Sequence, residues 1–506
     1  MTTATKQHQG NITVQLIITS IIASIGAFLF GYIGLSGGAT LNEGIADTNE
    51  ELVYRNEHYL DQYCRDGAGS DTMYLPSVYV PGIIATLIAS RVTRKNGRRR
   101  SMIVGGISYF IGATLIAIVP RLVQYGPDQL AIIIGRIFAG VGVGFGVQAI
   151  PLYLSEIAPA KYRGGLTFMF QLAISLGMLA SNIINYVTRV EGEHRWTDYR
   201  GISISFGVVA CLALLMVVGA KFLPETPNSL IQRGSKDEGR RSLEKLRGNE
   251  EVEEEFQDIV AASELASTVK TPFRSIFWKK NRPQLVMAIL MPAFQALTGM
   301  DSLLYYSSIL LLNMGFGEKS SFYSSVMVGG ALVLSTLLSM AVVDRLGRRV
   351  LLISGGIVMI ICQVIIGIIL VNKLGDDQNL SKGLSILVMV LICVFALAFG
   401  WSWGPIAWTI PSEIFPLEIR SIGQSITVAV NFGMVVVVAE SFMPLLCAFK
   451  FGLFIFYGGW IIIMTIFVCL FLPETKGVPI EDMTCVWRKH WFWKKIVPTQ
   501  HGHILS

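Results

Sequence analysis

Polar side chains interrupt an apolar stretch at residues 294–306, which read FQALTGMDSLLYY. They include Gln295, Thr298, Ser302 and the carboxylate of Asp301. An ionised carboxylate at the centre of a bilayer-spanning helix costs roughly 2.5–3.5 kcal/mol on insertion scales, so such a residue should face a wet cavity or a partner. The stretch is therefore the first candidate for a functional site.

The composition of the 506-residue chain indicates an integral membrane protein. Hydrophobic residues make up 52% and charged residues only 15%, and the mean hydropathy is +0.55. The net charge of +6 is concentrated in a few short loops and does not indicate nucleic-acid binding. Residues 1–15 are polar, and the first apolar run is long enough to span a membrane, which argues against a cleavable signal peptide.

Apolar runs of about twenty residues, the length that crosses roughly 30 Å of hydrocarbon, recur along the chain. They predict an all-α membrane protein with twelve transmembrane helices in two six-helix halves, at 16–222 and 283–472. The predicted spans are 16–38, 74–90, 102–120, 130–154, 166–187, 202–222, 285–312, 321–343, 351–371, 384–410, 422–446 and 451–472. Residues 223–282, which contain EEVEEEF, are polar and predict a linker of short amphipathic helices, with a disordered linker as the alternative.

Lys and Arg in the short loops set the orientation. Six basic residues follow the second span, and further ones follow the fourth, eighth and tenth spans, all on one side if the spans alternate. We expect that side to be cytoplasmic. The N-terminal residues 1–15, the linker and the tail at 473–506 are then inside, and residues 39–72 are outside.

The two halves repeat each other, which predicts parallel halves that rock about a central site. The matched pairs are RVTRKNGRRR with VVDRLGRRV, PLYLSEIAPAKYRG with TIPSEIFPLEIRS, and LPETP with LPETK. These motifs place Arg beside Glu or Asp at the predicted cytoplasmic helix ends. We expect ion pairs that break when this side opens; the alternative is that the charges only set the orientation. The candidates are Glu156, Arg163, Glu225, Asp344, Arg348, Glu413, Arg420 and Glu474.

Several longer segments carry a family resemblance. They are APAKYRGGL, FLPETPNSLIQRG, NRPQLVMAIL, GWSWGPIAWTIPSEIFPLEIRS, FKFGLF and FLPETKGVPIEDM, the last followed by VWRKHWFWKK. Over nearly its whole length the chain resembles the sugar porters of the major facilitator superfamily, and most of all the plant-type monosaccharide–proton symporters. The resemblance implies the major facilitator fold with an extracellular lid segment, and transport of a hexose-like monosaccharide by alternating access as sugar:proton symport.

The same resemblance implies a set of substrate-binding residues. A pyranose needs amides that both donate and accept hydrogen bonds, and an aromatic face for the C–H side of its ring. The implied contacts are Phe30, Gln171, Gln295, Asp301, Trp408 and Asn431. For Gln171 and Asn431, polar contacts between helices are the alternative. Gln295 and Asp301 are six residues apart and lie about 120° apart on a regular helix, so they share a ligand only if the helix unwinds near Gly299.

The proton site departs from the family pattern. The family reads FGYD in the first helix, where the Asp carries the proton, but this chain reads FGYIGLSGG and has no acid there. The expected partner Arg136 is retained, and something else must neutralise it or water must reach it. Asp301 and Glu440 stand where the family has amides, while Ala296 and Leu332 replace other amides. The proton-coupling candidates are therefore Arg136, Asp301 and Glu440.

Three explanations compete for these departures. In the first, the site takes a hexose-like sugar and Asp301 or Glu440 couples it to protons. In the second, the protein is a passive uniporter of a sugar or polyol. In the third, it is a poorly transporting sugar-binding sensor or paralogue, although the chain lacks the long tail of yeast-type sensors.

The cysteines divide into two groups. Cys64 and Cys447 both lie where an oxidising space is predicted, and the resemblance implies a disulfide between the lid and the second half at these two. The cysteines within spans are expected to be small buried residues, and Cys485 a free cytoplasmic thiol. No metal-binding spacing or nucleotide-binding loop accompanies the spans, so neither an enzyme nor a cofactor is expected. We expect a monomeric plasma-membrane transporter whose partners are the monosaccharide, protons in the symport case and the lipid bilayer.

Overall fold

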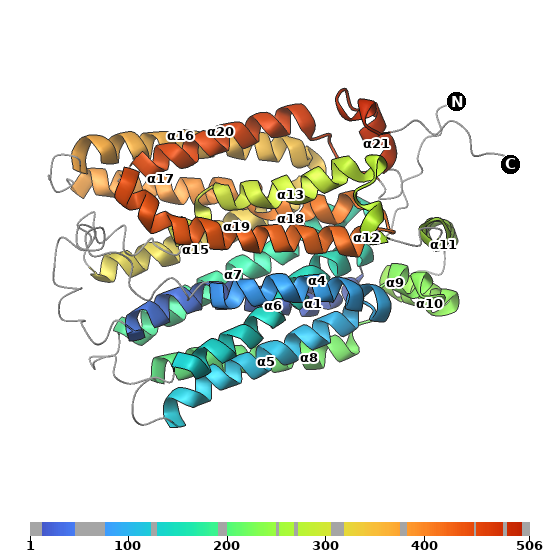
Figure 1. Cartoon of the computed structure of the whole chain (residues 1–506), viewed down its shortest axis with the longest axis horizontal. Coiled ribbons are helices and arrows are strands. Elements are labelled where there is room, and N and C mark those ends of the chain that lie inside the picture. Colours follow the sequence, from blue (N-terminus) through green and yellow to red (C-terminus); the bar gives the residue numbers. More distant parts are fainter. Residues whose placement is uncertain are drawn as a thin grey trace.

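The computed structural model describes residues 13–45, 76–122, 129–190, 200–248, 252–267, 272–304, 318–374, 382–449, 452–478 and 483–497. These residues form helices joined by turns and short links, with no strand among them. The long helices run side by side along one axis, with the first half of the sequence on one side of the bundle and the second half on the other (Figure 1). The predicted all-α fold is confirmed.

The described part of the first half contains six long helices. They are α1 Val14–Ile45, α4 Pro76–Asn96, α5 Arg98–Leu122, α6 Gln129–Ile157, α7 Arg163–Val190 and α8 Arg200–Phe222. Within this half α5 packs against α6 and α8, and α1 packs against α7. The first helix continues to Ile45, so the start of the predicted outer segment 39–72 is helical; residues 46–72 lie outside the described part of the chain.

The described part of the second half contains seven long or medium helices and a short helical segment, 300–304, that follows the first of them after a break. The seven helices are α13 Arg282–Leu297, α15 Glu318–Leu346, α16 Arg348–Leu374, α17 Lys382–Trp401, α18 Trp403–Ile414, α19 Arg420–Phe449 and α20 Leu453–Phe471. The predicted span 384–410 is divided at Ser402, between α17 and α18. The halves meet where α7 packs on α15 and α4 packs on α19.

Eleven of the described helical stretches are long and apolar enough to cross a membrane. The remaining predicted span, α4, is not among them, and its last turns carry Arg91, Arg94 and Lys95. It nevertheless lies within the bundle, beside α6 of its own half and α19 of the other (Figure 1). The chain is a multi-pass membrane protein.

Two large apolar cores hold the bundle together. Each is built mainly from one half, and burial of apolar side chains fixes which face of each helix turns inward. Trp408 and Phe432 of the second half belong to the core of the first half, and Phe168 of the first half belongs to the core of the second. These exchanged side chains lie where a central site between the halves is expected.

Short helices connect and follow the halves. Between them lie α9 Pro227–Gln232, α10 Lys236–Arg247, α11 Glu253–Ser267, α12 Pro272–Ser275 and the turn η4 Lys279–Asn281. The turn η3 Ala160–Tyr162 precedes α7, and α21 Met483–Lys489 and η7 Trp493–Lys495 follow α20. The predicted linker helices are therefore present. Thr13 Oγ1 donates to Leu246 O at 2.9 Å, so α1 begins beside α10.

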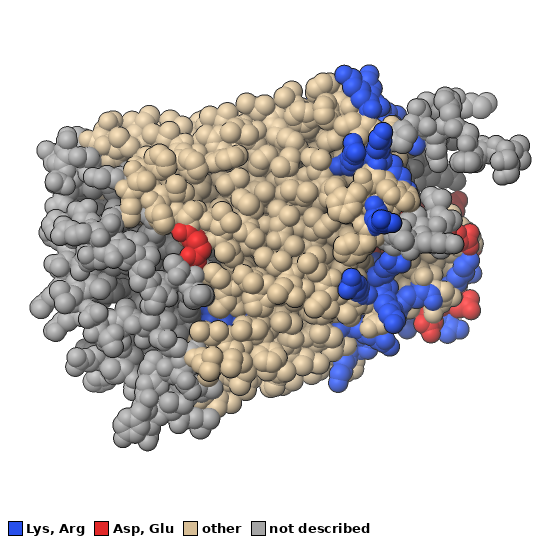
Figure 2. Space-filling view, in the orientation of Figure 1, with Lys and Arg blue, Asp and Glu red and all other residues tan. Residues whose placement is uncertain are grey.

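Lys and Arg gather at one end of the bundle, and a broad surface without exposed charge separates this end from the other (Figure 2). We call the end that carries Lys and Arg the charged end. It contains the last turns of α4 and α15, the first turns of α5 and α16, and the linker helices. Single glycines join α4 to α5 and α15 to α16. Gly97 has φ 99° and Gly347 has φ 93°, a backbone conformation that favours glycine.

Candidate functional site

The helix that carries the first candidate residues is broken near Gly299, which is the condition under which Gln295 and Asp301 can share a ligand. The helix α13 ends at Leu297, and Gly299 has φ 80°. Thr298 Oγ1 donates to Gln295 O at 2.7 Å and accepts the Met300 N–H at 3.3 Å, so one threonine closes the first segment and begins the next. Gln295 and Asp301 therefore lie on separate helical segments.

Gly299→Ala should disturb this break. A left-handed conformation costs a residue with a Cβ roughly 1–2 kcal/mol. The added Cβ would also lie 2.8 Å from the Tyr457 ring. We expect a lower melting temperature and weaker sugar binding in the purified protein. Gly433→Ala is the matched control, because its Cβ would meet nothing within 4 Å; equal losses in both variants would contradict the prediction.

Gln295 is the centre of a buried polar network. Its Nε2 donates to Gly404 O at 2.8 Å, and its Oε1 accepts from Asn431 Nδ2 at 3.0 Å. All three positions are buried. The network joins α13, α18 and α19, and it fixes the orientation of the Gln295 amide. The structure thus brings together two of the predicted sugar contacts, Gln295 and Asn431.

The first half contributes aromatic and amide groups from α7. Trp408 of α18 lies edge-on against Phe170, with ring centroids 5.4 Å apart, and Gln171 is the next residue of α7. Both Trp408 and Gln171 are buried. Trp408 therefore reaches across the boundary between the halves and packs beside the helix that carries Gln171.

Phe30 belongs to a second aromatic group between the halves. Its ring centroid lies 5.7 Å from that of Phe432, and Tyr79 lies 5.4 Å from Phe432 on another side. These three residues come from α1, α4 and α19. Tyr79 and Phe432 were missed in the sequence, because nothing in the residue types separates them from other buried aromatic side chains.

The acidic candidates occupy different places. Asp301 is half-buried in the segment after Gly299, and the hydroxyl of its neighbour Ser302 lies 3.3 Å from that of Tyr457. Glu440 is half-buried nine residues after Asn431, which puts it roughly 13 Å further along α19. Asp301 is thus the acid nearer to the Gln295 network along the chain.

Arg136 is buried on α6 and donates from Nε to Ser77 Oγ at 2.7 Å. Ser77 lies in the first turn of α4 and was not identified from the sequence. A hydroxyl can accept a hydrogen bond from the guanidinium but carries no charge. The retained arginine therefore has a hydroxyl neighbour on α4.

A small cavity of about 10 Å³ lies beside the Gly299 break. Its lining includes Gly299, Ser302, Gln363 and Tyr457, together with apolar side chains of α19 and α20. A volume near 10–15 Å³ holds about one water molecule. This cavity has no room for a sugar.

At the charged end the two halves build the same motif twice. Arg98 Nη2 contacts Glu156 Oε1 at 2.6 Å, and Arg348 Nη2 contacts Glu413 Oε1 at 2.7 Å. The second carboxylate oxygen accepts a hydroxyl in each case, from Thr226 at 2.6 Å and from Thr475 at 3.3 Å. Arg98, Thr226 and Thr475 take part in these contacts but were not among the predicted residues. All three lie in the repeated sequence motifs, which could have identified them.

Glu225 and Glu474 play a different part from the predicted side-chain ion pairs. Glu225 accepts the backbone N–H groups of Arg98 and Arg99, and Glu474 those of Arg348 and Arg349, at 2.9 to 3.3 Å. Carboxylates at these positions satisfy unpaired amides at the starts of α5 and α16 and interact favourably with the helix dipole. Glu225 also lies 3.9 Å from Arg233 of the linker.

Few of these contacts join the two halves. Arg420 Nη1 lies 3.5 Å from Glu156 Oε1, and Asp344 accepts the N–H groups of Gly164 and Gly165 at 3.2 and 2.9 Å. Arg163 begins the helix α7 that Asp344 contacts in this way. The Arg98–Glu156 and Arg348–Glu413 pairs lie within single halves. Among the contacts described above, those of Arg420 and Asp344 join the halves; that ion pairs at this end break on opening stays a prediction.

The structure describes every cysteine of the chain except Cys64. Cys211, Cys362, Cys393, Cys469 and Cys485 are free. Cys362 is buried, but Cys211 is exposed on the outer face of α8, so the expectation that all span cysteines are buried was wrong. Cys447 takes part in a disulfide. Its predicted partner Cys64 lies outside the described residues, so the pairing stays a prediction.

Comparison with known proteins adds independent findings. A family model described as sugar (and other) transporter matches residues 19–487. Sugar transport protein 7 of Arabidopsis thaliana is 53% identical over 97% of this chain and 94% of its own length, and sugar carrier protein A of Ricinus communis is 52% identical over 98% and 93%.

Solved structures of the proton:xylose symporter XylE of the major facilitator superfamily are also similar. The form bound to 6-bromo-6-deoxy-D-glucose gives a TM-score of 0.78 at 25% identity, covering 93% of this chain and 99% of that one. The inward-open form from E. coli gives 0.67 at 25% identity, with the same coverage.

Proposed function

This chain belongs to the sugar transporter family, and from that premise we propose that it carries a hexose-like monosaccharide by alternating access, coupled to protons. Sugar transport across a membrane, rather than catalysis, is its function. The proposal concerns the substrate, the residues that bind it and the coupling. The relatives are described as sugar transport or sugar carrier proteins, and XylE as a proton:xylose symporter.

The observation that carries the proposal is the buried Gln295 network beside a broken helix. Amides can donate to and accept from sugar hydroxyls, and Trp408 supplies an aromatic face from the same side. From the first half, Phe170, the residue before Gln171, packs against Trp408, and Phe30 packs against Phe432, the residue after Asn431. Transporter sites lie at such helix breaks between repeated halves. The proposed sugar contacts are thus Phe30, Gln171, Gln295, Asp301, Trp408 and Asn431.

The conformation supports alternating access. Arg420 with Glu156, and Asp344 with the start of α7, hold the halves together at the charged end. The chain is also less similar to the inward-open form of XylE than to the sugar-analogue complex. We infer a state that is closed at the charged end, which the positive charge assigns to the cytoplasm.

This assignment extends to the topology. Both termini, the linker at 223–282 and the tail at 473–506 are placed in the cytoplasm, and residues 39–72 outside. The halves at 16–222 and 283–472 are the moving units, and the protein is a plasma-membrane monomer. The outer segment is then joined to the second half by a Cys64–Cys447 disulfide, which accounts for the disulfide at Cys447.

Proton coupling is assigned to Asp301. It follows the broken segment directly after the Gly299 turn, whereas Glu440 lies two to three turns beyond Asn431. A carboxylate next to the sugar contacts can change its protonation as the site alternates between closed and open surroundings. Passive uniport is the alternative, because this chain has no acid in the FGYIGLSGG stretch of its first helix.

Asp301→Asn tests the coupling directly. Asparagine keeps the shape and the sugar-binding capacity of the side chain but cannot exchange a proton. In proteoliposomes containing the wild-type protein, an inwardly directed proton gradient should increase uptake of radiolabelled hexose. The variant should retain sugar counterflow and lose the stimulation by the gradient.

Glu440→Gln is the matched control and should keep the stimulation. Sugar-induced alkalinisation that survives Asp301→Asn would rule out Asp301 as the carrier. Wild-type uptake that ignores the gradient would establish passive uniport, and a failure of counterflow for every hexose tested would contradict the transport proposal itself.

A further inference from the structure

The chain after the last membrane helix folds back onto the end of that helix. Trp491 Nε1 donates to Leu470 O at 2.9 Å, and Trp493 Nε1 donates to Phe471 O at 2.7 Å. These are carbonyls of the last turn of α20, which have no partner within the helix. The segment 483–497 is therefore tied to the end of an apolar span, and we call it the tail segment.

One face of the tail segment is packed into the bundle. The rings of Trp487 and Trp493 are both buried and lie edge to face with centroids 5.8 Å apart. Phe492 lies edge to face against Phe471, with centroids 4.9 Å apart. This packing holds the other face of the segment in a fixed position.

The outer face combines a large apolar ring with positive charge. Trp491 is 54% exposed, and Lys489, Lys494 and Lys495, two to four residues away in the chain, are exposed as well. The tail segment contains four Lys or Arg residues and no Asp or Glu. Burial and the nearby charge of Arg349 both lower the pKa of His490, so the imidazole is neutral at pH 7 and the charge comes from Lys and Arg alone.

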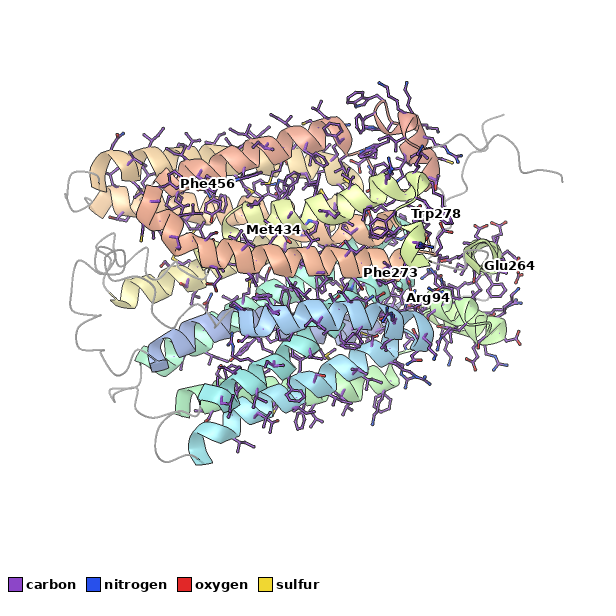
Figure 3. The ribbon with its side chains drawn as sticks, viewed as in Figure 1. Arg94, Glu264, Phe273, Trp278, Met434 and Phe456 are labelled. Carbon is purple, nitrogen blue, oxygen red and sulfur yellow. The ribbon has the colours of Figure 1, made fainter. Side chains whose placement is uncertain are left out.

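The height of Trp491 in the membrane follows from its bond to Leu470. A tryptophan at the end of an apolar span lies where hydrocarbon gives way to headgroups. Similar pairs surround the charged end: Arg91 lies over the Phe273 ring at 6.0 Å, and Lys280 over the Trp278 ring at 5.6 Å. Figure 3 labels Phe273 and Trp278, which lie at the charged end of the bundle.

We propose that the tail segment is a binding site for anionic phospholipid headgroups, a function separate from the binding and transport of sugar. Lys489, Lys494 and Lys495 contact the phosphate and carboxylate groups, and Trp491 packs on the upper part of the acyl chains. Basic residues next to a membrane helix attract anionic lipids. A small dissolved anion would make no apolar contact with the exposed indole ring of Trp491. The combination of positive charge and an exposed apolar ring therefore indicates a lipid.

Native mass spectrometry of the purified full-length protein tests the site, with phosphatidylserine and phosphatidylcholine as probes. Lys494→Gln/Lys495→Gln should weaken retention of phosphatidylserine about 25-fold, or about fivefold for each lysine near the surface. Retention of phosphatidylcholine should not change. Arg241→Gln/Lys245→Gln removes the same charge from exposed positions of the linker helix α10 and should leave both lipids unaffected.

Trp491→Ala separates a lipid site from a simple anion site. It should weaken phosphatidylserine retention while sugar counterflow in phosphatidylcholine liposomes stays at the wild-type level. The proposal would be overturned if the linker control lost as much phosphatidylserine retention as the lysine double variant. It would also be overturned if the wild type retained the two lipids equally, or if the lysine double variant retained phosphatidylserine like the wild type. The proposal would also be overturned if the protein bound inorganic phosphate, Lys494→Gln/Lys495→Gln abolished that binding and Trp491→Ala left it unchanged.

Discussion

Arg348→Ala should destabilise the protein by about 3–5 kcal/mol, because it leaves a carboxylate buried without its counter-ion. The Arg348 Nη2 atom lies 2.7 Å from Glu413 and 3.1 Å from Asp344. Both Arg348 and Glu413 are almost fully buried. Removing the guanidinium also removes the group that holds the start of α16 against α18.

The melting temperature of the detergent-solubilised protein, followed by size-exclusion chromatography, measures this effect. Arg345→Ala is the matched control, since Arg345 is exposed at the end of α15 three residues earlier, and it should change little. Arg348→Met with Glu413→Gln should recover most of the loss, because replacing both charges removes the unpaired one. A single variant as stable as the wild type would contradict the assigned role of this pair.

Gln295→Leu should lower the affinity for sugar by about tenfold or more. The substitution removes an amide proposed to bind sugar, and it leaves the Asn431 amide and the Gly404 carbonyl without the partners described above. A buried polar group that loses its partner costs about 1–3 kcal/mol. Sites built to hydrogen-bond a hydroxyl depend strongly on each such group.

Gln284→Leu removes the same amide from the same helix, eleven residues and roughly 16 Å earlier, and serves as the control. Gln284 is buried but lies toward the charged end. Uptake of radiolabelled hexose and sugar binding to the purified protein should fall only for Gln295→Leu. If both variants lose uptake equally while remaining folded, the position of Gln295 has no special part in binding.

Much of this architecture could be predicted from residue order. Apolar length gave the helices, and the motif repeat predicted that the charged ends would match. The helix break followed from a condition: Gln295 and Asp301 lie about 120° apart on a regular helix, so sharing one ligand requires the helix to unwind near the glycine between them. The linker helices followed from alternating charge and apolar residues, which is a local signal.

Contacts that depend on how helices cross could not be predicted in the same way. The Gln295–Asn431 hydrogen bond joins residues 136 positions apart, and the Phe30–Phe432 contact depends on the rotation of α1 and α19. Residue type also did not separate Glu225 and Glu474, which accept backbone amides, from Glu156 and Glu413, which pair with guanidinium groups. That distinction rests on where each helix begins.

The difference between the contacts within a half and those between the halves has a mechanical consequence. Each half is closed by its own Arg–Glu–Thr motif, formed by buried side-chain charges at 2.6 to 3.3 Å. Across the boundary, the contacts described above at this end are Arg420 with Glu156 at 3.5 Å and the hydrogen bonds from the first turn of α7 to Asp344 at 2.9 and 3.2 Å. Each half can therefore move as a unit, and we expect opening at this end to break the contacts of Arg420 and Asp344. Substitutions in the Arg–Glu–Thr motif of either half should therefore change the stability of the protein. Substitutions at Arg420 or Asp344 should instead change the equilibrium between the closed and open states of this end.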